Sequence, residues 1–259
     1  MAVTQKLMCR VERIIHHGHH GERVYTVVLR PERPAPVFRP GQFLHLAVDP
    51  YDATSFWPES RVFSIASSPS ERDRLCITYS VVGRFTARMD TELVEGRHVW
   101  VKMPYGDFVV KDTTDVVLFA GGTGITAFTA FLDGTAPGAS QSICLAYGAR
   151  TRSLLIYRDL VQRSARKLPL LDVSYFVEEH LGNDDNGNNG DSLEAAPEGH
   201  EHEREQIGRV SVAALWPRIR RPKEAHYYIS GPPAMLRSVS QDLRARGIAA
   251  EAIHIDAWE

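Results

Sequence analysis

Three glycines within four residues, at positions 121, 122 and 124, are the first residues of this chain whose spacing points to chemistry. They follow the apolar run 116–120 and precede an apolar-periodic segment, so we expect a buried strand, a tight turn and a helix. Such a turn presents backbone N–H groups and the positive end of a helix, which together suit a phosphate. Gly122-x-Gly124-x-x-Ala127 also matches the Gly/Ala form of the dinucleotide-binding fingerprint.

The glycines alone leave two interpretations open: a phosphate-binding turn, or a tight connection between a strand and a helix. In the simple Rossmann pattern an acidic residue follows the next strand and holds a ribose. The next expected strand here, 143–147, is followed instead by Gly148, Ala149 and Arg150. We therefore expect a nucleotide site of a different lineage from the simple Rossmann type.

A second group of residues whose types could bind a ligand is Arg61-Val62-Phe63-Ser64. Strand alternation places Arg61 and Phe63 on one face and Val62 and Ser64 on the other. A cation, an aromatic ring and hydroxyls in so short a segment are unusual for a strand that only builds a core. These residues are therefore candidates for ligand binding.

The composition limits the classes of function. The 259 residues carry a formal net charge of −2, which gives no general attraction for nucleic acid or membrane surfaces. Apolar runs are too short to span a bilayer, and residues 1–10 lack the apolar core of a signal peptide. We expect a cytoplasmic protein with neither a nucleic acid nor a membrane as partner.

Cysteines and histidines give little support for a metal centre. The three cysteines, Cys9, Cys76 and Cys144, are too few for an all-cysteine zinc site or an iron–sulfur cluster, each of which takes four. We expect small buried residues in a reducing compartment. Four histidines within 16–20 could grip a metal, yet a mobile turn is a poor preorganised site. We favour an exposed hairpin tip and predict no metal.

The elements that must position these residues fall into two groups. Residues 7–110 contain short alternating runs with turns about every 8 to 12 residues, which is typical of a small barrel or sandwich. After Asp115 buried strands alternate with helices, which predicts a parallel sheet. We expect domains at 1–112 and 113–259. The expected strands of the second domain lie near 116–120, 143–147, 172–177, 226–230 and 252–256, and its helices near 124–133, 153–163, 211–216 and 233–246.

One segment, 181–206, interrupts the second domain. Between Asn183 and Glu205 it holds eight acidic residues and one arginine, with few apolar side chains. Such a composition buries too little apolar surface to order itself, so we predict a flexible acidic loop. An acidic docking arm for a partner is the alternative.

Four stretches occur in an order that resembles the ferredoxin–NADP reductase superfamily. They resemble, in turn, its flavin motif Arg-x-Tyr-Ser, the Pro-Tyr-Gly-x-Phe turn, the nucleotide-phosphate loop and the Cys-Gly-Pro-Pro-x-Met motif. The resemblance implies an antiparallel Greek-key β-barrel flavin domain followed by a doubly wound parallel-sheet nucleotide domain. It covers about 7 to 258 outside the acidic loop. The four stretches are Arg61-Val62-Phe63-Ser64, Pro104-Tyr105-Gly106-Asp107-Phe108, Gly121 to Thr126 and Ser230-Gly231-Pro232-Pro233-Ala234-Met235.

The resemblance implies FAD as the bound cofactor. Arg61 would bind the pyrophosphate, Phe63 would lie against the isoalloxazine ring, and Ser64 would direct its hydroxyl towards flavin N5. The backbone at a helix start, 83–86, would meet the diphosphate, and 77–79 the adenosine. The FAD-binding residues implied are Arg61, Val62, Phe63, Ser64, Ile77, Thr78, Tyr79, Gly83, Phe85, Thr86 and Trp258. Trp258 would cover the free flavin face, or else cap the final strand.

The resemblance also implies NADH or NADPH as co-substrate. Arg150 could hold a 2′-phosphate, whereas Glu178 and Glu179 would repel one, so the choice between the coenzymes stays open. Ser64 and Ser230 are the residues implied for catalysis, Ser230 standing where many relatives have cysteine. The NAD(P)-binding residues implied are Gly122, Thr123, Gly124, Thr126, Arg150, Gly231 and Pro232.

The implied activity is hydride transfer from nicotinamide to flavin, followed by release of single electrons. Because the three cysteines cannot ligate an internal cluster, the acceptor would be a separate molecule: a ferredoxin, a flavodoxin or an oxygenase component. Two alternatives remain. One is a flavin reductase that releases reduced free flavin, and the other is a non-catalytic flavoprotein that senses redox state or docks through its acidic loop.

Overall fold

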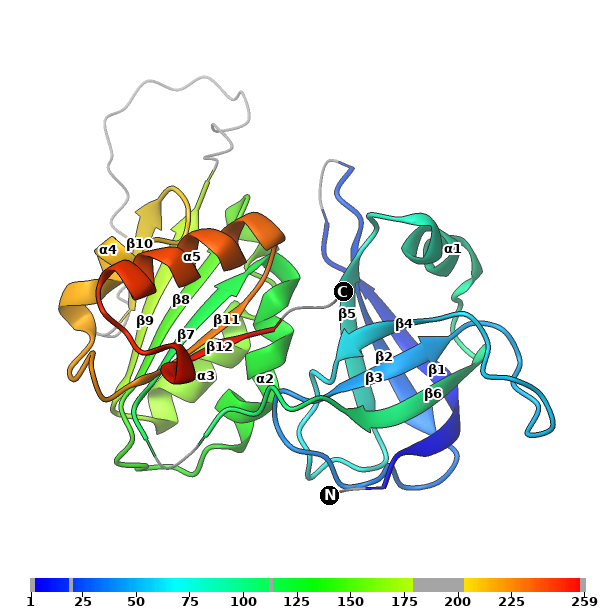
Figure 1. Cartoon of the computed structure of the whole chain (residues 1–259). Helices are drawn as coiled ribbons and strands as arrows, with labels where there is room; N and C mark the ends of the chain where they lie inside the picture. The colour runs from blue at the N-terminus through cyan, green and yellow to red at the C-terminus, as the bar shows by residue number, and fades with distance from the viewer. Residues whose placement is uncertain (1–2, 19–20, 112–113, 179–202, 257–259) are drawn as a thin grey trace.

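The computed structural model describes residues 3–18, 21–111, 114–178 and 203–256, which form two domains side by side (Figure 1). Each domain is built on a six-stranded sheet. Strand pairing is antiparallel in the first sheet and parallel in the second. The fold is therefore the predicted one, an antiparallel barrel followed by a doubly wound nucleotide domain.

The first domain is a barrel-like sheet with strand order β4-β3-β6-β1-β2-β5 and one helix, α1. Its strands alternate buried and exposed residues, as in β1, where Leu7, Cys9 and Val11 point into the core. Alternation of this kind gives the sheet one face in the core and one in solvent. The elements are β1 (Gln5–His16), β2 (Val24–Pro31), β3 (Phe43–Ala47), β4 (Ser60–Ser64), β5 (Leu75–Ser80), α1 (Arg84–Glu92) and β6 (His98–Tyr105).

The second domain has strand order β10-β9-β8-β7-β11-β12 with helices on both faces (Figure 1). Every residue of β7 and β8 is buried, as their continuous apolar runs predict. Helices α2 and α3 cover one face, while α4 and α5 cover the other. The elements are β7 (Val116–Gly121), α2 (Thr126–Gly134), β8 (Ile143–Ala149), α3 (Arg158–Lys167), β9 (Leu171–Val177), β10 (Glu203–Ile207), α4 (Val212–Leu215), β11 (His226–Ser230), α5 (Pro233–Ala245) and β12 (Ile253–Ile255). Short 3₁₀ turns lie at Gly122–Ile125, Arg152–Leu154, Trp216–Arg218 and Ala250–Ala252.

Three local expectations are wrong. Residues 203–206, which we expect in the acidic loop, belong to strand β10, paired in parallel with β9. The expected helix 153–163 is two pieces, a 3₁₀ turn and then α3. Pro104 and Tyr105, expected in a turn, still belong to β6. Residues 112 and 113, the predicted domain boundary, and 181–202 of the predicted loop lie outside the described residues, so these assignments stay predictions.

Two hydrogen bonds join the domains where their edges meet. The Thr129 hydroxyl in α2 donates to the Ala66 carbonyl, just beyond β4, at 2.8 Å, and Thr129 is fully buried. The hydroxyls of Thr78 in β5 and Tyr157 at the start of α3 share a hydrogen bond of 2.7 Å. The middle of β5 and the segment just beyond β4 therefore lie directly against the helices that follow β8 and β7.

Candidate functional site at the domain seam

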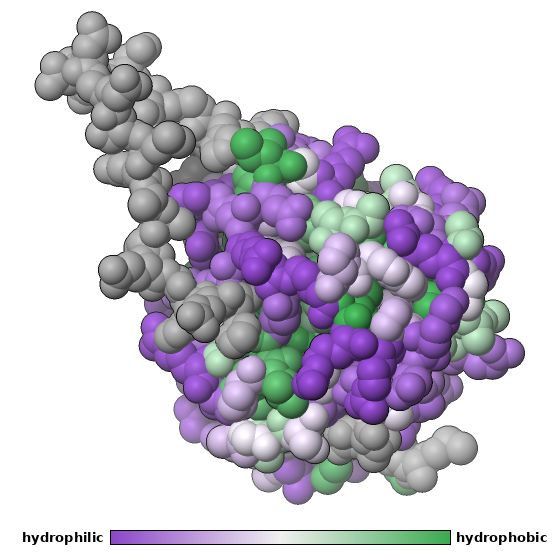
Figure 2. Space-filling model, turned by 90° about the vertical axis from the view of Figure 1, so that its left-hand side faces the viewer, coloured by the Kyte–Doolittle hydropathy of each residue, from purple (hydrophilic) through white to green (hydrophobic). Residues whose placement is uncertain are grey.

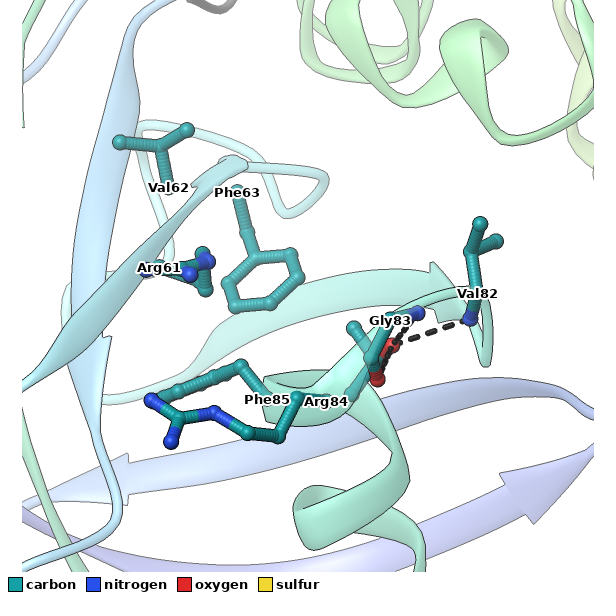
Figure 3. A pocket seen from close by; sticks show the side chains of 8 residues that line it. Arg61, Val62, Phe63, Val82, Gly83, Arg84 and Phe85 are labelled. Atoms are coloured by element: carbon teal, nitrogen blue, oxygen red, sulfur yellow. Dashed lines mark hydrogen bonds between the residues drawn. The ribbon is translucent and has the colours of Figure 1, made fainter.

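The first half of the site is a hollow of about 240 Å³ in the first domain, between β4 and the start of α1 (Figure 3). Strand β4 supplies one wall and the loop into α1 supplies the other. This arrangement brings together the first three residues of the predicted flavin motif, without Ser64, and those of the predicted helix start. The lining residues are Arg61, Val62, Phe63, Val82, Gly83, Arg84, Phe85 and Thr86.

Cross-strand pairing explains which way β4 presents its side chains. Arg61 pairs with Leu46 and Phe63 with Leu44, both core residues, so Arg61 and Phe63 share the inner face, as predicted. In Figure 3 Val62 points away from the other two side chains. The Phe63 ring lies 6.1 Å from that of Tyr79, centroid to centroid, and so extends the aromatic core towards the hollow.

Helix α1 begins with a cation, which is an unfavourable choice for an isolated helix. Arg84 is its first residue and its first turn holds no acidic residue, although the positive end of a helix repels cations. Arg61 adds a second guanidinium nearby, with Cζ 5.4 Å from the Phe85 ring centroid. Two cations at a helix N-terminus make sense where an anion binds.

Glu59 partly neutralises both arginines. Its Oε1 accepts a hydrogen bond from Arg84 Nη2 at 2.9 Å, and Arg61 Nη2 lies 3.9 Å from the same oxygen. One carboxylate thus balances one of the two positive charges, and a net positive charge remains at the helix start. Sequence reasoning missed the side chains of Arg84 and Glu59, although a cation at the first position of the expected helix was a usable signal.

Thr86 closes the turn into α1. Its hydroxyl accepts hydrogen bonds from the backbone N–H groups of Val82 and Gly83, each at 3.0 Å, and donates to the Gly83 carbonyl. These bonds engage the hydroxyl in capping the helix, so its predicted contact with a diphosphate stays a prediction. A Cβ on Gly83 would meet nothing within 4 Å, which leaves the turn open on its outer side.

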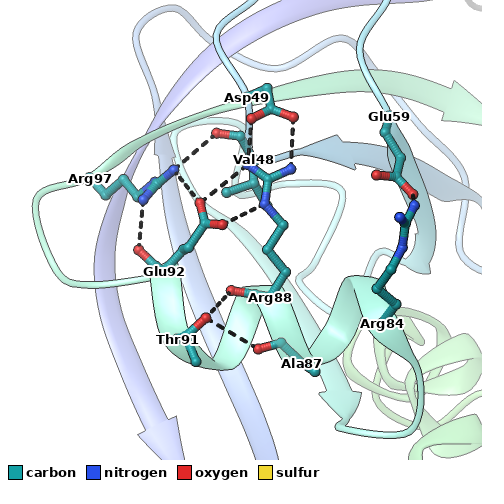
Figure 4. Close-up of polar contacts among 9 residues, drawn as sticks. All are labelled: Val48, Asp49, Glu59, Arg84, Ala87, Arg88, Thr91, Glu92 and Arg97. Carbon is teal, nitrogen blue, oxygen red and sulfur yellow. Dashed lines mark hydrogen bonds and ion pairs between the residues drawn. The ribbon is translucent and has the colours of Figure 1, made fainter.

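An ion-pair network holds the far end of α1 against the barrel (Figure 4). Arg88 pairs with both Asp49 and Glu92, and Arg97 bonds to Glu92 Oε2 at 2.9 Å and to the Glu92 carbonyl at 3.0 Å. The hydrogen bonds from Arg88 lower the pKa of the Asp49 and Glu92 carboxyls, so both are charged near neutral pH. The network thereby fixes the direction in which the helix start points.

Strand β5 leads into the loop that lines this hollow, but its own side chains are already engaged. Ile77 and Tyr79 belong to the barrel core. Thr78 forms a chain of hydrogen-bonded hydroxyls with Thr26, at 2.7 Å, and Tyr157. Burial raises the pKa of the Tyr157 hydroxyl, which therefore stays protonated. Contacts of 77–79 with an adenosine stay predictions, and Tyr157 is an interdomain residue that sequence reasoning missed.

The second half of the site is the glycine edge, where β7 and β11 end beside each other. Ser230 pairs with Ala120, so the turns after the two strands are neighbours. A Cβ on Gly124 would lie 2.3 Å from the Ser230 carbonyl oxygen, and one on Gly231 would lie 3.0 Å from Gly121 Cα. Gly124 and Gly231 are therefore required by the close approach of the two turns.

Gly122 is required for another reason. It has φ of +54°, and a Cβ there would meet nothing within 4 Å. The turn at Gly122 is therefore open to a ligand, while its neighbours pack against β11. Thr126 donates its hydroxyl to the Thr123 carbonyl at 2.8 Å, which holds the turn in shape. The glycine fingerprint is thus both a packing device and an accessible helix start.

Ser230 has a buried partner that sequence reasoning missed. Its hydroxyl donates to Asp256 Oδ2 at 2.8 Å, and both side chains are less than 5% exposed. The Asp256 backbone N–H donates to the Ile229 carbonyl at 2.9 Å. A buried carboxylate that accepts the hydroxyl hydrogen fixes the orientation of Ser230. An acidic residue at the end of the last expected strand, 252–256, was the available signal.

The remaining predictions are settled only in part. Ser64 is buried at the end of β4, Arg150 is exposed after β8, and Pro232 leads into α5. Trp258 lies outside the described residues, so both interpretations of it stay predictions. Cys9 and Cys144 are buried free thiols, as expected, whereas the free thiol Cys76 is only half-buried. Burial raises the pKa of Cys9 to about 12.

The described part of the chain holds neither a candidate metal site nor a helix able to span a membrane. Groups of three or more His, Cys, Asp or Glu side chains placed to hold a metal ion do not occur there. His19 and His20 of the histidine-rich turn fall outside it. Helices in that part are also too short or too polar to cross a membrane.

Known proteins resemble this chain in sequence and fold. Residues 118–241 match the family described as oxidoreductase NAD-binding domain. The chain is 26% identical over 245 residues to a flavohemoprotein of Rhizobium meliloti, covering 91% of this chain and 57% of the relative. It is 28% identical over 229 residues to the ferredoxin reductase component of 3-ketosteroid-9-alpha-monooxygenase of Mycolicibacterium smegmatis, covering 86% and 56%. The chain thus spans little more than half the length of these curated relatives.

A solved structure gives the same picture for the fold. The flavohem-like FAD/NAD-binding domain of nitric oxide dioxygenase from Vibrio cholerae superimposes with a TM-score of 0.72 at 19% identity, covering 97% of this chain and 98% of that one. Its two-domain fold is the one described above. In sequence and fold the chain is therefore similar to ferredoxin reductase-like, FAD/NAD-binding oxidoreductases.

Proposed function

We propose that this chain is an NAD(P)H-dependent flavoprotein reductase. It would bind FAD in the hollow of the first domain, take a hydride from NADH or NADPH at the glycine edge, and pass single electrons to a separate acceptor. The acceptor would be a ferredoxin, a flavodoxin or an oxygenase component. The observation that carries the proposal is that each of two directly joined domains has a helix start suited to an anion, at α1 in the first and after β7 in the second.

The first hollow fits a flavin dinucleotide. Arg61 and Arg84 can neutralise the two charges of a diphosphate, with Glu59 moving aside. The open side of Gly83 leaves room for a phosphate against the helix start. Phe63 offers an aromatic face on the inner side of β4. These four features together favour a dinucleotide over an isolated phosphate.

The glycine edge fits a nicotinamide dinucleotide. The open turn at Gly122 offers backbone N–H groups at the start of a helix, which suits a pyrophosphate. Gly231 and Pro232 border the same edge from β11. The match of residues 118–241 to an NAD-binding domain supports this half of the proposal.

When bound, FAD accepts a hydride from the nicotinamide and can release electrons one at a time. The protein positions the reacting groups, because the reacting atoms must approach to about 3–3.5 Å. It also excludes water from the site. Asp256 holds the Ser230 hydroxyl in one orientation at the glycine edge. The buried Thr129–Ala66 bond locks the two domains at the seam and helps to exclude water.

The test is anaerobic reduction of the full chain. The purified protein is incubated with FAD, desalted, and mixed with NADH or NADPH while the visible absorbance of oxidised flavin is followed. Rapid bleaching, reversed by a one-electron acceptor such as ferricyanide, is the expected result. Arg30→Ala, which removes an exposed arginine of β2 far from the hollow, is the control for handling and should behave as the wild type.

Three other outcomes would contradict the proposal. A protein that binds no flavin after incubation would remove its basis. Flavin that is reduced but lost on gel filtration would instead favour a flavin reductase. Retained flavin that neither coenzyme reduces would favour a non-catalytic flavoprotein.

A further inference from the structure

Two arginines at the carboxyl edge of the second sheet share one carboxylate. Arg152 follows β8, Arg158 is the first residue of α3, and Glu205 lies in β10. Glu205 Oε1 accepts from Arg152 Nε at 3.0 Å and from Nη2 at 2.6 Å, and its Oε2 accepts from Arg158 Nη1 at 3.4 Å. Both carboxylate oxygens are therefore engaged by guanidinium groups.

This cluster of Arg152, Arg158 and Glu205 lies where it can affect the choice between NADH and NADPH. In doubly wound nucleotide domains the group that follows the second strand meets the adenosine ribose, whose 2′ position is a hydroxyl in NADH and a phosphate in NADPH. Here the second strand is β8, beside β7 with its glycine edge. The residues that follow β8 include Arg150 and Arg152. A 2′-phosphate would need unengaged cations at this point.

The cations at this edge are largely engaged. Glu205 is held on a paired strand, and its side chain is 19% exposed. The Arg158 guanidinium lies over the Tyr175 ring, 4.9 Å from its centroid, and so has little freedom to turn away. Arg209 pairs with Glu178 at the end of β9. Arg150 is exposed, where a single cation attracts an anion only weakly.

The buried Tyr175 hydroxyl lies among the charged groups at this edge of the sheet. Burial raises its pKa first, and the carboxylates of Glu203, Asp159 and Glu205 raise it further, while Arg158 alone lowers it. Carboxylates and guanidinium groups therefore lie close together around this hydroxyl. A phosphate dianion brought beside Glu205 would meet repulsion that a hydroxyl group does not.

We propose that Glu205 makes this chain select NADH over NADPH, an inference that rests on the proposed function. A 2′-phosphate would have to displace Glu205 from Arg152 and Arg158 and then lie beside the displaced carboxylate. A 2′-hydroxyl requires no displacement and can donate a hydrogen bond to a carboxylate at this edge. The residue acts as a fixed counter-ion that occupies the site of the phosphate.

The experiment compares both coenzymes on the FAD-loaded full chain, with ferricyanide as acceptor. The wild type should have a kcat/KM for NADH about tenfold or more above that for NADPH, and Glu205→Gln should reduce this ratio about tenfold. The change should lie in the KM for NADPH, with kcat nearly constant. Glu203→Gln removes an equal charge from the same face of β10 but frees no arginine, because Glu203 Oε2 accepts from Gln162. Its ratio should change less than about twofold.

A second variant tests the same inference if Glu205→Gln folds poorly. Arg152→Gln removes one of the two guanidinium groups that balance the Glu205 carboxylate. NADPH binding should therefore weaken further. A wild type that prefers NADPH, an unchanged ratio in Glu205→Gln, an equal change in Glu203→Gln, or a gain in NADPH use by Arg152→Gln would each overturn the inference.

Binding of adenosine fragments separates this inference from the proposed function. Calorimetry with adenosine 5′-monophosphate and adenosine 2′,5′-bisphosphate measures the 2′-phosphate penalty without any redox chemistry. If neither coenzyme reduces the flavin, the proposed function fails. Weaker binding of the bisphosphate, relieved in Glu205→Gln, would still support the selective role of Glu205, and equal binding of both fragments would exclude it.

Discussion

The two edges of this molecule that we propose to bind phosphate groups are built from different groups. The first domain presents two arginine side chains at the start of α1, whereas the second presents the open turn at Gly122. Guanidinium groups act through charge and can be screened or replaced. A backbone turn acts through shape, and no other residue type reproduces it. The first edge should therefore respond gradually to substitution, and the second abruptly.

A carboxylate shared by two arginines occurs at each edge, which refines the comparison. Glu59 binds Arg84 closely and Arg61 loosely, and its side chain is 38% exposed. Glu205 binds its two arginines through both oxygens and is half as exposed. The exposed carboxylate should give way to an anion, while the enclosed one should resist it. The same motif can thus admit a phosphate at one edge and exclude it at the other.

The largest effect is expected from Gly124→Ala. Its Cβ would lie 2.3 Å from the Ser230 carbonyl oxygen, so the turns after β7 and β11 must separate. We expect the free energy of unfolding to fall by about 1–3 kcal/mol, as for other overpacked sites. Hydride transfer should fall about 100-fold, because a displacement of about 1 Å misaligns the reacting atoms. Urea denaturation and anaerobic stopped-flow absorbance measure the two effects.

Gly134→Ala is the matched control for this substitution. Gly134 ends α2, and a Cβ there would meet nothing within 4 Å. Its rate should equal that of the wild type, and its free energy of unfolding should be unchanged or higher by up to about 1 kcal/mol. A Gly124→Ala protein with unchanged rate and stability would show that the two edges do not differ in the way described.

The second-largest effect is expected at the start of α1, where Arg61 and Arg84 lie. Arg61→Ala should weaken FAD binding about 10- to 100-fold, the effect of removing one charge-assisted hydrogen bond. Arg84→Ala should weaken it less, because the Arg84 side chain is 86% exposed and that of Arg61 is 55% exposed. Quenching of flavin fluorescence on titration of the apoprotein measures both affinities. Equal affinities in wild type and Arg61→Ala would remove this side chain from the diphosphate site.

Glu59→Gln should have a smaller effect of opposite sign. Removing the carboxylate frees both guanidinium groups, so FAD affinity should rise about two- to fivefold, consistent with an exposed ion pair. Glu12→Gln, which breaks the exposed pair with Arg30 on β2, should leave the affinity unchanged. Weaker FAD binding by Glu59→Gln would mean that the carboxylate positions the arginines more than it competes with the ligand.

Much of this architecture is predictable because apolar periodicity and glycine spacing are local signals. The runs at 116–120 and 143–147 predict strands buried on both faces, and both strands are. The alternation of Arg61 and Phe63 predicts their shared face. These features depend on neighbouring residues alone, so a sequence pattern can carry them.

The features that were missed depend on residues far apart in the sequence. Strand β10 is polar apart from its last residue, Ile207, and owes its place to pairing with β9 and to ion pairs with 152 and 158. Asp256 meets Ser230 only because β12 pairs with β11. Tyr157 reaches Thr78 across the domain seam. No local pattern specifies such partners.

Ionic strength offers the mildest test of the comparison between the two edges. Raising the salt concentration from about 0.05 to 0.5 M shortens the screening length from about 14 Å to about 4 Å, which weakens exposed charge pairs most. Affinity for FAD, held by Arg61 and Arg84, should therefore fall several-fold, while affinity for NADH at the glycine turn should fall less. Titrations of both ligands at several salt concentrations measure the two slopes. If the NADH slope is the steeper one, side-chain charge contributes more than the open turn at Gly122 to the nicotinamide site, and the contrast between the edges is reversed.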